Sequence, residues 1–376
     1  MDFETARAVA DGSGESVSAI SPVPHGQPWL SVLVPFHNVE PFIGACLESI
    51  LAQIAVCPGI ELILLDDKST DGSEAVCRRL IEDCGVDVRL LQHPENRGIA
   101  AARNSLLDAA RGDYLWFVDS DDMLLPGAIE ALRAVMDKAR PDVVLCDYLR
   151  QDSVRYTTFA GEGGCHTRCI ETLIAGTFAK RRLHLWSRIW RRDLFADDIR
   201  FPDGAHFEDV AVVPRLLLRA RCFYYAADPW VFYRSRPGSI MARINRACAG
   251  FDRRGNDDMA RALAGFGQAM ATAVPHAAPE TNFVVARFVA REFTKIAKRL
   301  IRGGTGSSNW RHTRAELHRY RMEMESCSPL PFAFVGRQYL LKGKIGRGLE
   351  LAFWLAIARA LPADPMPVVA TEQGFV

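Results

Sequence analysis

The sequence predicts an α/β fold built on a mostly parallel, Rossmann-like sheet, with a helical extension toward the C-terminus. Four short apolar runs, each followed by polar residues, are typical of buried strands and span 30–36, 61–65, 86–91 and 114–118. Apolar residues recur at helical spacing between these runs, over 41–53, 72–83 and 99–110. Strands that alternate with helices favour a parallel sheet, which brings the carboxyl ends of its strands to one edge, where ligands bind.

Later segments continue the α/β pattern as far as about residue 240. The turns support the reading, because Asp71 and Glu74 are spaced as a capping box and Pro126 suits the first turn of a helix that runs to Lys138. A strand is expected over 142–147. Three more strands are expected over 186–190, 222–225 and 230–233, the last two as a pair, and a helix over 208–219.

Composition limits the function and the location of the protein. Of 376 residues, 49% are apolar, and 46 basic residues balance 45 acidic ones, so no overall positive field suggests a nucleic-acid partner. Residues 1–28 are rich in Gly, Ser and Pro and are expected to form a disordered tail. No apolar stretch reaches the roughly 18 residues that cross a bilayer. We therefore expect a cytoplasmic protein that does not span a membrane.

Acidic residues gather where two of the predicted strands end. Asp66 and Asp67 follow the second strand, and Asp119, Asp121 and Asp122 follow the fourth. Carboxylates crowded at one edge of a sheet repel one another unless a cation joins them. Hard oxygen ligands suit Mg²⁺ or Mn²⁺, so the sequence predicts a divalent metal at this edge. The alternative is a purely structural role, in which these residues only cap the helices that follow.

Four motifs occur in a fixed order along the first third of the chain. They are the runs Leu33-Val34-Pro35-Phe36-His37-Asn38, Leu65-Asp66-Asp67-Lys68-Ser69-Thr70-Asp71-Gly72-Ser73, Asn96-Arg97-Gly98 with Ala102-Arg103-Asn104, and Phe117-Val118-Asp119-Ser120-Asp121-Asp122. With them, residues 29 to 240 resemble a family 2 glycosyltransferase of the GT-A fold. The resemblance implies a nucleotide-sugar-binding half over 29–150 and an acceptor-binding half over 151–240. Residues 241–376 then form a mostly helical C-terminal region.

The resemblance also implies roles for individual residues. Asp67 would hold the base of the nucleotide, Asp119 would face the ribose and the metal, and Asp121 would bind the metal directly. The residues expected around the nucleotide sugar are Pro35, Asn38, Asp66, Asp67, Arg97, Asp119, Ser120 and Arg236. Arg97 precedes a helix and can reach the nucleotide. For Arg103, within that helix, a salt bridge to an acidic strand end is equally compatible with the sequence.

The second half supplies a candidate general base. Glu208 and Asp209 begin a predicted helix, and the resemblance points to Asp209 as the base that activates an acceptor hydroxyl. One base opposite one leaving group implies in-line displacement and inversion at the anomeric carbon. The alternative is that both carboxylates merely favour a helix N-terminus through the helix dipole. Trp186 and Trp190 are candidates for stacking on a sugar, with core packing as the alternative, and His206 is read as a loop residue.

The resemblance implies a UDP-sugar donor and a saccharide or lipid-linked acceptor in bacterial surface polysaccharide synthesis. Two other classes fit the sequence less well. A sugar nucleotidyltransferase needs a glycine-rich loop after the first strand, which this chain lacks, and a binding module without activity needs neither Asp121 nor Asp209. The C-terminal region holds a basic amphipathic pattern over 285–300, and a second apolar segment spans 348–361. These segments either pack on the catalytic core or contact an anionic membrane surface, such as the inner face of the cytoplasmic membrane.

Overall fold

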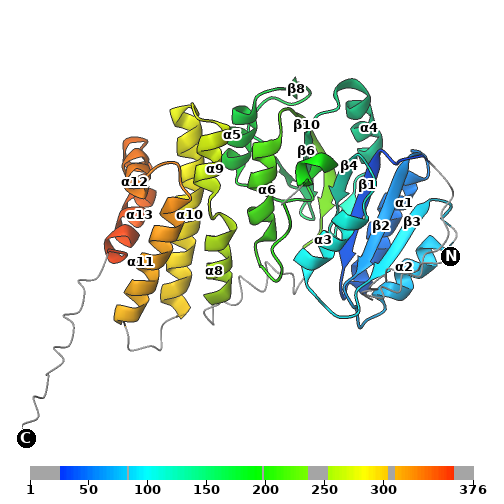
Figure 1. Cartoon of the computed structure of the whole chain (residues 1–376), viewed down its shortest axis with the longest axis horizontal. Coiled ribbons are helices and arrows are strands. Elements are labelled where there is room, and N and C mark those ends of the chain that lie inside the picture. Colours follow the sequence, from blue (N-terminus) through cyan, green and yellow to red (C-terminus); the bar gives the residue numbers. More distant parts are fainter. Residues whose placement is uncertain (1–25, 83, 197–198, 236–252, 304–309, 360–376) are drawn as a thin grey trace, which may run out of the picture.

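A single mixed sheet forms one half of the described protein, and the C-terminal helices extend from one side of it (Figure 1). The computed structural model describes residues 26–82, 84–196, 199–235, 253–303 and 310–359. The sheet has ten strands in the order β3-β2-β1-β4-β9-β6-β10-β5, with β7 beside β6 and β8 beside β10. Most of the tail expected over 1–28 lies outside the described residues. Its last residues do make contacts, since Gln27 Nε2 donates to Asp113 Oδ1 over 3.0 Å.

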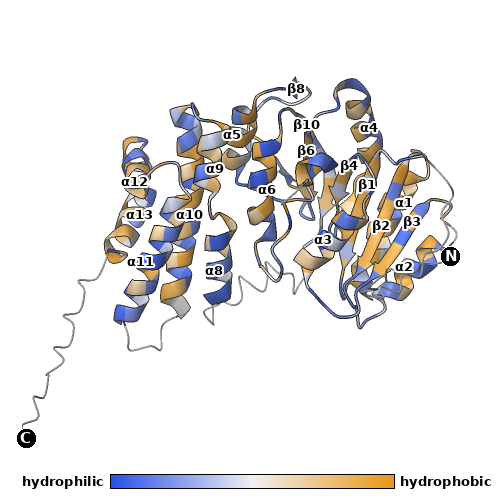
Figure 2. Cartoon of the chain, in the orientation of Figure 1, coloured by the Kyte–Doolittle hydropathy of each residue, from blue (hydrophilic) through white to orange (hydrophobic). Residues whose placement is uncertain are grey.

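The parallel half of the sheet confirms the prediction from the sequence. Its strands are β1 (Leu30–Phe36), β2 (Ile60–Asp66), β3 (Asp87–Gln92) and β4 (Tyr114–Phe117), and all neighbouring pairs among them are parallel. β1 and β2 are buried at every position, which is why they are mostly apolar (Figure 2), and the buried polar residues Ser31 and Glu61 hydrogen-bond to each other. Because β1 lies between β2 and β4, the two acidic strand ends flank one strand.

The second half of the sheet is mixed. β9 (Arg188–Arg191) runs antiparallel between β4 and β6 (Val143–Arg150), and β6 pairs in parallel with β10 (Phe223–Tyr233). Three two-residue strands complete it: β5 (Met123–Leu124), β7 (Arg155–Tyr156) and β8 (His166–Thr167). The expected strand pair over 222–225 and 230–233 is wrong. Both segments belong to β10, because β6 pairs with each of them across a register shift between Tyr225 and Val231.

Helices cover both faces of the sheet. One core cluster joins the sheet to α1 (Glu40–Ile54), α2 (Ser73–Ile81) and α4 (Ala128–Ala139). The other joins it to α3 (Ile99–Ala109), α5 (Ile170–Lys180), α6 (Glu208–Arg219) and a 3-10 turn over Arg192–Phe195. Alternation along β1 sends Val32 and Val34 into the first cluster and Leu33 into the second.

Two helix starts differ from the expected ones. α4 begins at Ala128 after Gly127, which has a positive φ of 80°, so Pro126 lies before the helix and not in its first turn. The capping box is also wrong. Asp71 Oδ1 does accept the backbone N–H of Ser73 over 3.0 Å, but Glu74 turns away to pair with Arg78 over 2.7 Å.

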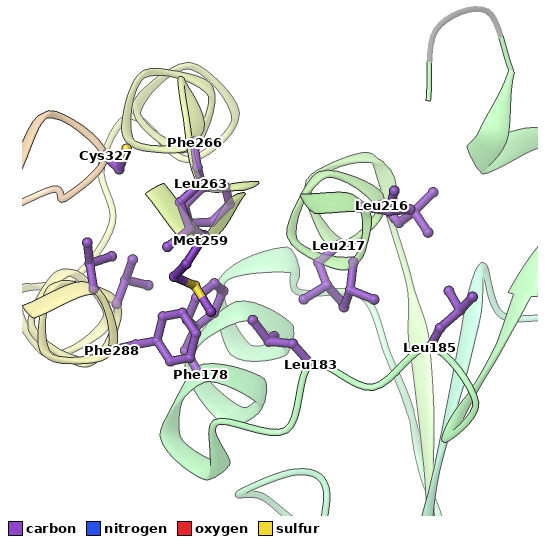
Figure 3. Packing of buried hydrophobic residues seen from close by; sticks show 14 of the residues in the cluster. Phe178, Leu183, Leu185, Leu216, Leu217, Met259, Leu263, Phe266, Phe288 and Cys327 are labelled. Atoms are coloured by element: carbon purple, nitrogen blue, oxygen red, sulfur yellow. The ribbon is translucent and has the colours of Figure 1, made fainter. Parts of the chain in front are cut away.

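The C-terminal helices continue the second core cluster away from the sheet (Figures 1 and 3). They are α8 (Arg253–Ala262), α9 (Phe266–Ala273), α10 (Pro279–Gly303), α11 (Trp310–Ser326), α12 (Phe332–Leu341) and α13 (Ile345–Ile357). Phe178 of α5 joins them to the sheet domain, because its ring stacks on Phe266 at 5.4 Å and meets Phe288 edge-on at 5.3 Å. Among the described residues, no helix is long and apolar enough to cross a membrane.

The basic amphipathic segment expected over 285–300 is the middle of α10. Its apolar residues, among them Val285, Val289 and Phe293, are fully buried in the helical core. The interpretation that this helix packs on the catalytic domain is therefore confirmed. The same burial means that its apolar face cannot lie on a membrane.

Candidate active site

The two aspartates after β2 are buried and hold the neighbouring loops. Asp67 is 3% exposed; its Oδ1 accepts the backbone N–H of Arg97 over 2.9 Å and its Oδ2 that of Gly98 over 2.7 Å. His93 Nδ1 lies 2.7 Å from the same Oδ1. Gly98 has a φ of 85°, a conformation that favours glycine at this turn into α3. Asp67 thereby fixes the loop that carries Arg97, whose side chain is exposed.

Asp66 and Asn38 organise the facing loop. Asp66 is fully buried, and its Oδ1 accepts the N–H of Ser69 over 2.8 Å. Asn38, just beyond β1, accepts the N–H of Thr70 over 2.7 Å and has a positive φ of 50°, which asparagine tolerates better than most residues. Pro35 is buried in β1 itself. These residues therefore meet at the carboxyl ends of β1 and β2, as the sequence predicted.

A tight turn after β4 gathers three carboxylates. Asp122 N donates to the backbone oxygen of Asp119 over 2.9 Å, and Ser120, inside this turn, is buried. Carboxylate oxygens of Asp119, Asp121 and Asp122 all lie within 4.8 Å of one another. Asp122 Oδ2 is buried without a hydrogen-bond partner in the described part of the chain. Burial and the charges of Asp119 and Asp121 raise the pKa of Asp122 well above its ordinary value.

These features fit a divalent cation. The donors are hard carboxylate oxygens, and a buried oxygen that lacks a partner is the kind of group that a metal or its bound water satisfies. Asp119 and Asp121 were expected as ligands, and Asp122 adds a third carboxylate. Arg234 closes the far side of the turn, since its backbone N–H donates to Asp122 Oδ1 over 2.9 Å. Arg236, expected near the diphosphate, lies outside the described residues.

Arg103 joins this turn to the second half of the protein. Its guanidinium, 3% exposed, donates from Nη2 to Asp119 over 3.0 Å and from Nη1 to Glu208 over 2.7 Å and to Asp209 over 2.6 Å. The salt-bridge interpretation of Arg103 is confirmed. The side chain links three carboxylates from two distant segments, so the candidate metal turn and the candidate base share one site.

The carboxylates at the start of α6 are strongly affected by burial. Burial raises the pKa of Glu208 to about 7, although the Arg103 guanidinium opposes the rise. The pKa of Asp209 is also raised, first by burial and then by the charge of Asp119, again against the effect of Arg103. Asp209 Oδ2 additionally accepts the N–H of Leu185 over 3.2 Å. A carboxylate whose pKa is raised toward neutrality is better matched to proton transfer than an ordinary surface aspartate.

Comparison with known proteins identifies the family. The family model described as glycosyl transferase family 2 matches residues 31–189. Glycosyltransferase GlyG of Streptococcus pneumoniae serotype 4 is 32% identical over 224 residues, which make up 56% of this chain and 72% of GlyG. The chain belongs to glycosyltransferase family 2. The minor teichoic acid biosynthesis protein GgaB of Bacillus subtilis is also 32% identical over 219 residues, 55% of this glycosyltransferase but only 23% of GgaB.

A solved structure shares the fold of this family 2 glycosyltransferase over most of its length. S. aureus TarS 1–349, solved in complex with UDP-GlcNAc, superimposes with a TM-score of 0.64 and 19% identity over 88% of this chain and 90% of that one. The agreement extends beyond the family match, so it includes the helical C-terminal region. It confirms the predicted fold class, a GT-A-like, mostly parallel α/β sheet with a helical extension.

An aromatic group to which the sequence analysis assigned only Trp186 lies beside the candidate site, since Leu185 N–H donates to Asp209. His184 stacks on Trp186 at 4.6 Å between ring centroids, and Tyr148 packs edge-on against Trp186 at 4.9 Å. Burial and two nearby arginines lower the pKa of His184 to about 3, so its ring is neutral. Trp186 is thus mostly a packing residue, and Trp190 is fully buried in the core. The only feature of the sequence that could have predicted the contact of His184 and Tyr148 with Trp186 is the presence of these aromatic residues themselves.

His206 has the loop role expected of it. Its Nδ1 lies 2.7 Å from Asp258 Oδ2, and its backbone N–H donates to the same oxygen over 3.2 Å. This pair ties the loop before α6 to α8. It therefore helps to position Asp209 from the side of the helical region.

The raised pKa of Glu208 predicts how the stability of this glycosyltransferase depends on pH. Between the ordinary carboxyl pKa and about 7, the folded protein holds a proton on Glu208 that the unfolded chain releases. The free energy of unfolding without metal should therefore fall as pH rises from about 5 to 8, with a contribution from Glu208 of up to roughly 3 kcal/mol. Glu208→Gln, which cannot ionise, should remove this contribution. Urea unfolding at both pH values in EDTA measures it, and an unchanged slope in the variant would contradict the assignment.

Proposed function

We propose that this enzyme is an inverting glycosyltransferase that moves a sugar from a UDP-sugar to a hydroxyl group of a saccharide or lipid-linked acceptor in bacterial surface polysaccharide synthesis. The observation that carries the proposal is the position of Arg103. One guanidinium contacts both Asp119, in the acidic turn, and Asp209, at the start of α6. In-line displacement requires a base on the side of the anomeric carbon opposite the leaving group, and a guanidinium that contacts both Asp119 and Asp209 keeps these two groups within reach of one sugar.

The donor side of the proposed site lies over the ends of β1, β2 and β4. Asp119 and Asp121, joined by Asp122, would hold Mg²⁺ or Mn²⁺, which supplies positive charge opposite the diphosphate as it departs. The residues proposed to surround the nucleotide and its phosphates are Pro35, Asn38, Asp66, Asp67, Arg97, Asp119, Ser120 and Arg236. The buried carboxylate of Asp67 supports this role, because it holds the backbone at Arg97 and Gly98 in place. The complex of TarS with UDP-GlcNAc favours a UDP-linked donor.

The chemical step assigned to the chain is a proton transfer. Asp209 takes the proton of the acceptor hydroxyl as its oxygen forms a bond to the anomeric carbon. The bond from that carbon to the phosphate oxygen breaks, and its electron pair leaves with UDP. Attack from the face opposite the leaving group inverts the anomeric centre. The Arg103 guanidinium orients Asp209 throughout, and the Leu185 N–H holds its second oxygen.

The acceptor side is proposed to lie along the aromatic group of Tyr148, Tyr156, His184 and Trp186, which lies beside Asp209. The segment from His184 to Trp186 connects the two, because Leu185 between them contacts Asp209. Tyr156 stacks on Tyr148 at 5.2 Å and is only partly buried. Aromatic faces of this kind bind the apolar face of a sugar ring. A neutral His184 adds a hydrogen-bonding edge without a charge.

Donor hydrolysis tests the proposal without knowledge of the acceptor. We expect the enzyme to release UDP slowly from one or more UDP-sugars in the presence of Mn²⁺, and to stop doing so in EDTA. Added Mn²⁺ should restore release, because the three carboxylates of the turn repel one another and the diphosphate without a cation. A panel of UDP-, GDP- and dTDP-sugars in this assay also identifies the nucleotide.

Two controls separate the alternatives. Asp121→Ala should weaken metal-dependent donor binding, measured as the loss of thermal stabilisation by UDP-sugar and Mn²⁺. Release of pyrophosphate in place of UDP from mixtures of sugar phosphate and UTP would identify a nucleotidyltransferase. UDP release that is equally fast in EDTA and in Mn²⁺ would rule out the proposed metal role.

A further inference from the structure

The outer face of α12 and α13 carries a concentration of exposed apolar side chains. Six of the ten large hydrophobic side chains that are exposed in the described residues lie here, namely Phe334, Leu340, Leu341, Ile345, Leu349 and Phe353. Ile345, Leu349 and Phe353 recur at every fourth position of α13, on the side opposite its buried residues. Figure 1 places both helices at the end of the helical region that lies farthest from the sheet. Exposed apolar residues grouped in this way mark a contact surface.

The same hairpin is strongly basic. Residues 337–347 contain the four positive residues Arg337, Lys342, Lys344 and Arg347 and no acidic residue. All four side chains are exposed. The surface therefore combines apolar side chains that project outward with positive charges at the turn between the two helices.

A groove between this hairpin and α10 adds further positive charge. It has a volume of about 200 Å³ and is lined by residues that include Arg291, Lys295, Lys298, Tyr339 and Arg347. The two lysines are neutralised, since Lys295 pairs with Glu292 and Lys298 with Glu350. Within the described part of the chain, neither Arg291 nor Arg347 has a carboxylate partner. Two uncompensated arginines thus face one groove.

Neighbouring groups show how concentrated this charge is. Burial lowers the pKa of Arg181, and so do the charges of Arg291, Arg287 and Arg347. Tyr339 is 6% exposed and lines the groove. Burial raises the pKa of its hydroxyl, whereas the same group of arginines lowers it. A tyrosine beside converging arginines in one groove can bind the oxygens of a phosphate group.

We propose that the α12–α13 hairpin and the arginine groove beside it dock this enzyme on an anionic phospholipid bilayer. The exposed apolar residues enter the boundary between head groups and acyl chains, and the arginines meet lipid phosphates. A second copy of the chain fits less well, because a symmetric contact would bring the same positive charges face to face. A soluble phosphate would fill the groove but leave the apolar residues exposed. Of the two segments that the sequence suggested, the docking surface uses exposed residues of the one over 348–361, whereas α10 contributes only its basic side.

Vesicle binding by the full-length protein tests the proposal. We expect co-sedimentation with vesicles that contain phosphatidylglycerol, weaker binding at high salt, and little binding to pure phosphatidylcholine. Ile345→Asp with Leu349→Asp removes the apolar contact, and Arg291→Ser with Arg347→Ser removes the groove charge. Each double variant should weaken binding by at least about tenfold, a loss of roughly 1.4 kcal/mol. Val56→Asp and Met322→Asp, at exposed apolar positions elsewhere, are the matched controls and should bind normally.

Three results would overturn the proposal. Binding that survives either double variant would show that this surface is not the contact. Sedimentation velocity that reveals a dimer, lost in Ile345→Asp with Leu349→Asp while vesicles are not bound, would assign the face to a second copy. Thermal stabilisation by inorganic phosphate that depends on Arg291 and Arg347, again without vesicle binding, would assign the groove to a soluble anion. UDP release by the variants reports whether they are folded, and we expect it to stay normal. A failure of the membrane-docking proposal can therefore be distinguished from a failure of the proposed transferase activity.

Discussion

Replacement of Asp209 by asparagine is expected to lower turnover by about 10²–10⁴-fold, the usual contribution of a general base. The change is nearly isosteric. The amide oxygen can still accept a hydrogen bond from Arg103 Nη1, so the contact between α6 and α3 should survive. The amide cannot take up the proton of the acceptor hydroxyl. Donor binding, which depends on the turn at Asp119 to Asp122, should therefore remain close to normal while transfer fails.

Glu208 provides the matched control for this substitution. It contacts the same nitrogen of Arg103, but it is more deeply buried than Asp209, with 11% of its side chain exposed against 23%. Glu208→Gln should retain turnover within a few-fold. Measurement of transfer rate and of thermal stabilisation by donor in both variants separates chemistry from binding. Wild-type turnover in Asp209→Asn would rule out Asp209 as the base, and wild-type turnover there together with a large loss in Glu208→Gln would assign the role to Glu208.

The sequence was sufficient to predict the parallel half of the fold. The strand ends at Asp66 and Asp119 can be recognised because each follows a mostly apolar run, which is typical of a strand buried on both faces. Alternation of strands and helices then fixes which ends meet. The carboxylate cluster of Asp119 and Asp121 follows from this local information alone. Its third member, Asp122, was counted in the acidic cluster from the sequence but was not expected as a metal ligand.

The strand pairings in the mixed half of the sheet could not be predicted from apolar periodicity and the alternation of strands and helices. β9 is only four residues long and enters the sheet antiparallel between β4 and β6, a choice made by partners distant in the sequence. The break within β10 looks like a turn because Asp228 and Pro229 interrupt the apolar pattern. Only the pairing of both parts with β6 shows that the strand continues. Local periodicity does not report such pairings.

Arg103 shows the same limit within the site. Its position in α3 follows from periodicity, but its partners Glu208 and Asp209 lie more than 100 residues later in the chain. The sequence left a salt bridge and a nucleotide contact equally open. Only the packing of α6 against the same face of the sheet as α3 decides between them.

Removal of the Arg103 charge is expected to be among the most destabilising single changes in this protein. Arg103→Met should lower the free energy of unfolding by about 3–5 kcal/mol, because it leaves the buried Glu208 and the partly buried Asp119 and Asp209 close to one another without their common partner. The loss should be greater at about pH 8 than at about pH 5. Without the guanidinium, the pKa values of Glu208 and Asp209 in the folded state rise further, so stability falls as pH rises through that window.

The surface pair of Arg200 and Asp108 is the control for this change. Both side chains are about half exposed or more, so Arg200→Met should cost less than about 1 kcal/mol and show little dependence on pH. Urea unfolding of both variants at the two pH values gives the comparison, and Arg103→Lys, which keeps the charge but loses the forked geometry, should fall between them. If Arg103→Met were no less stable than Arg200→Met, the three carboxylates would not depend on the guanidinium. Asp209 would then need another group to orient it toward the acceptor, because its contact with the Leu185 N–H restrains only one of its two oxygens.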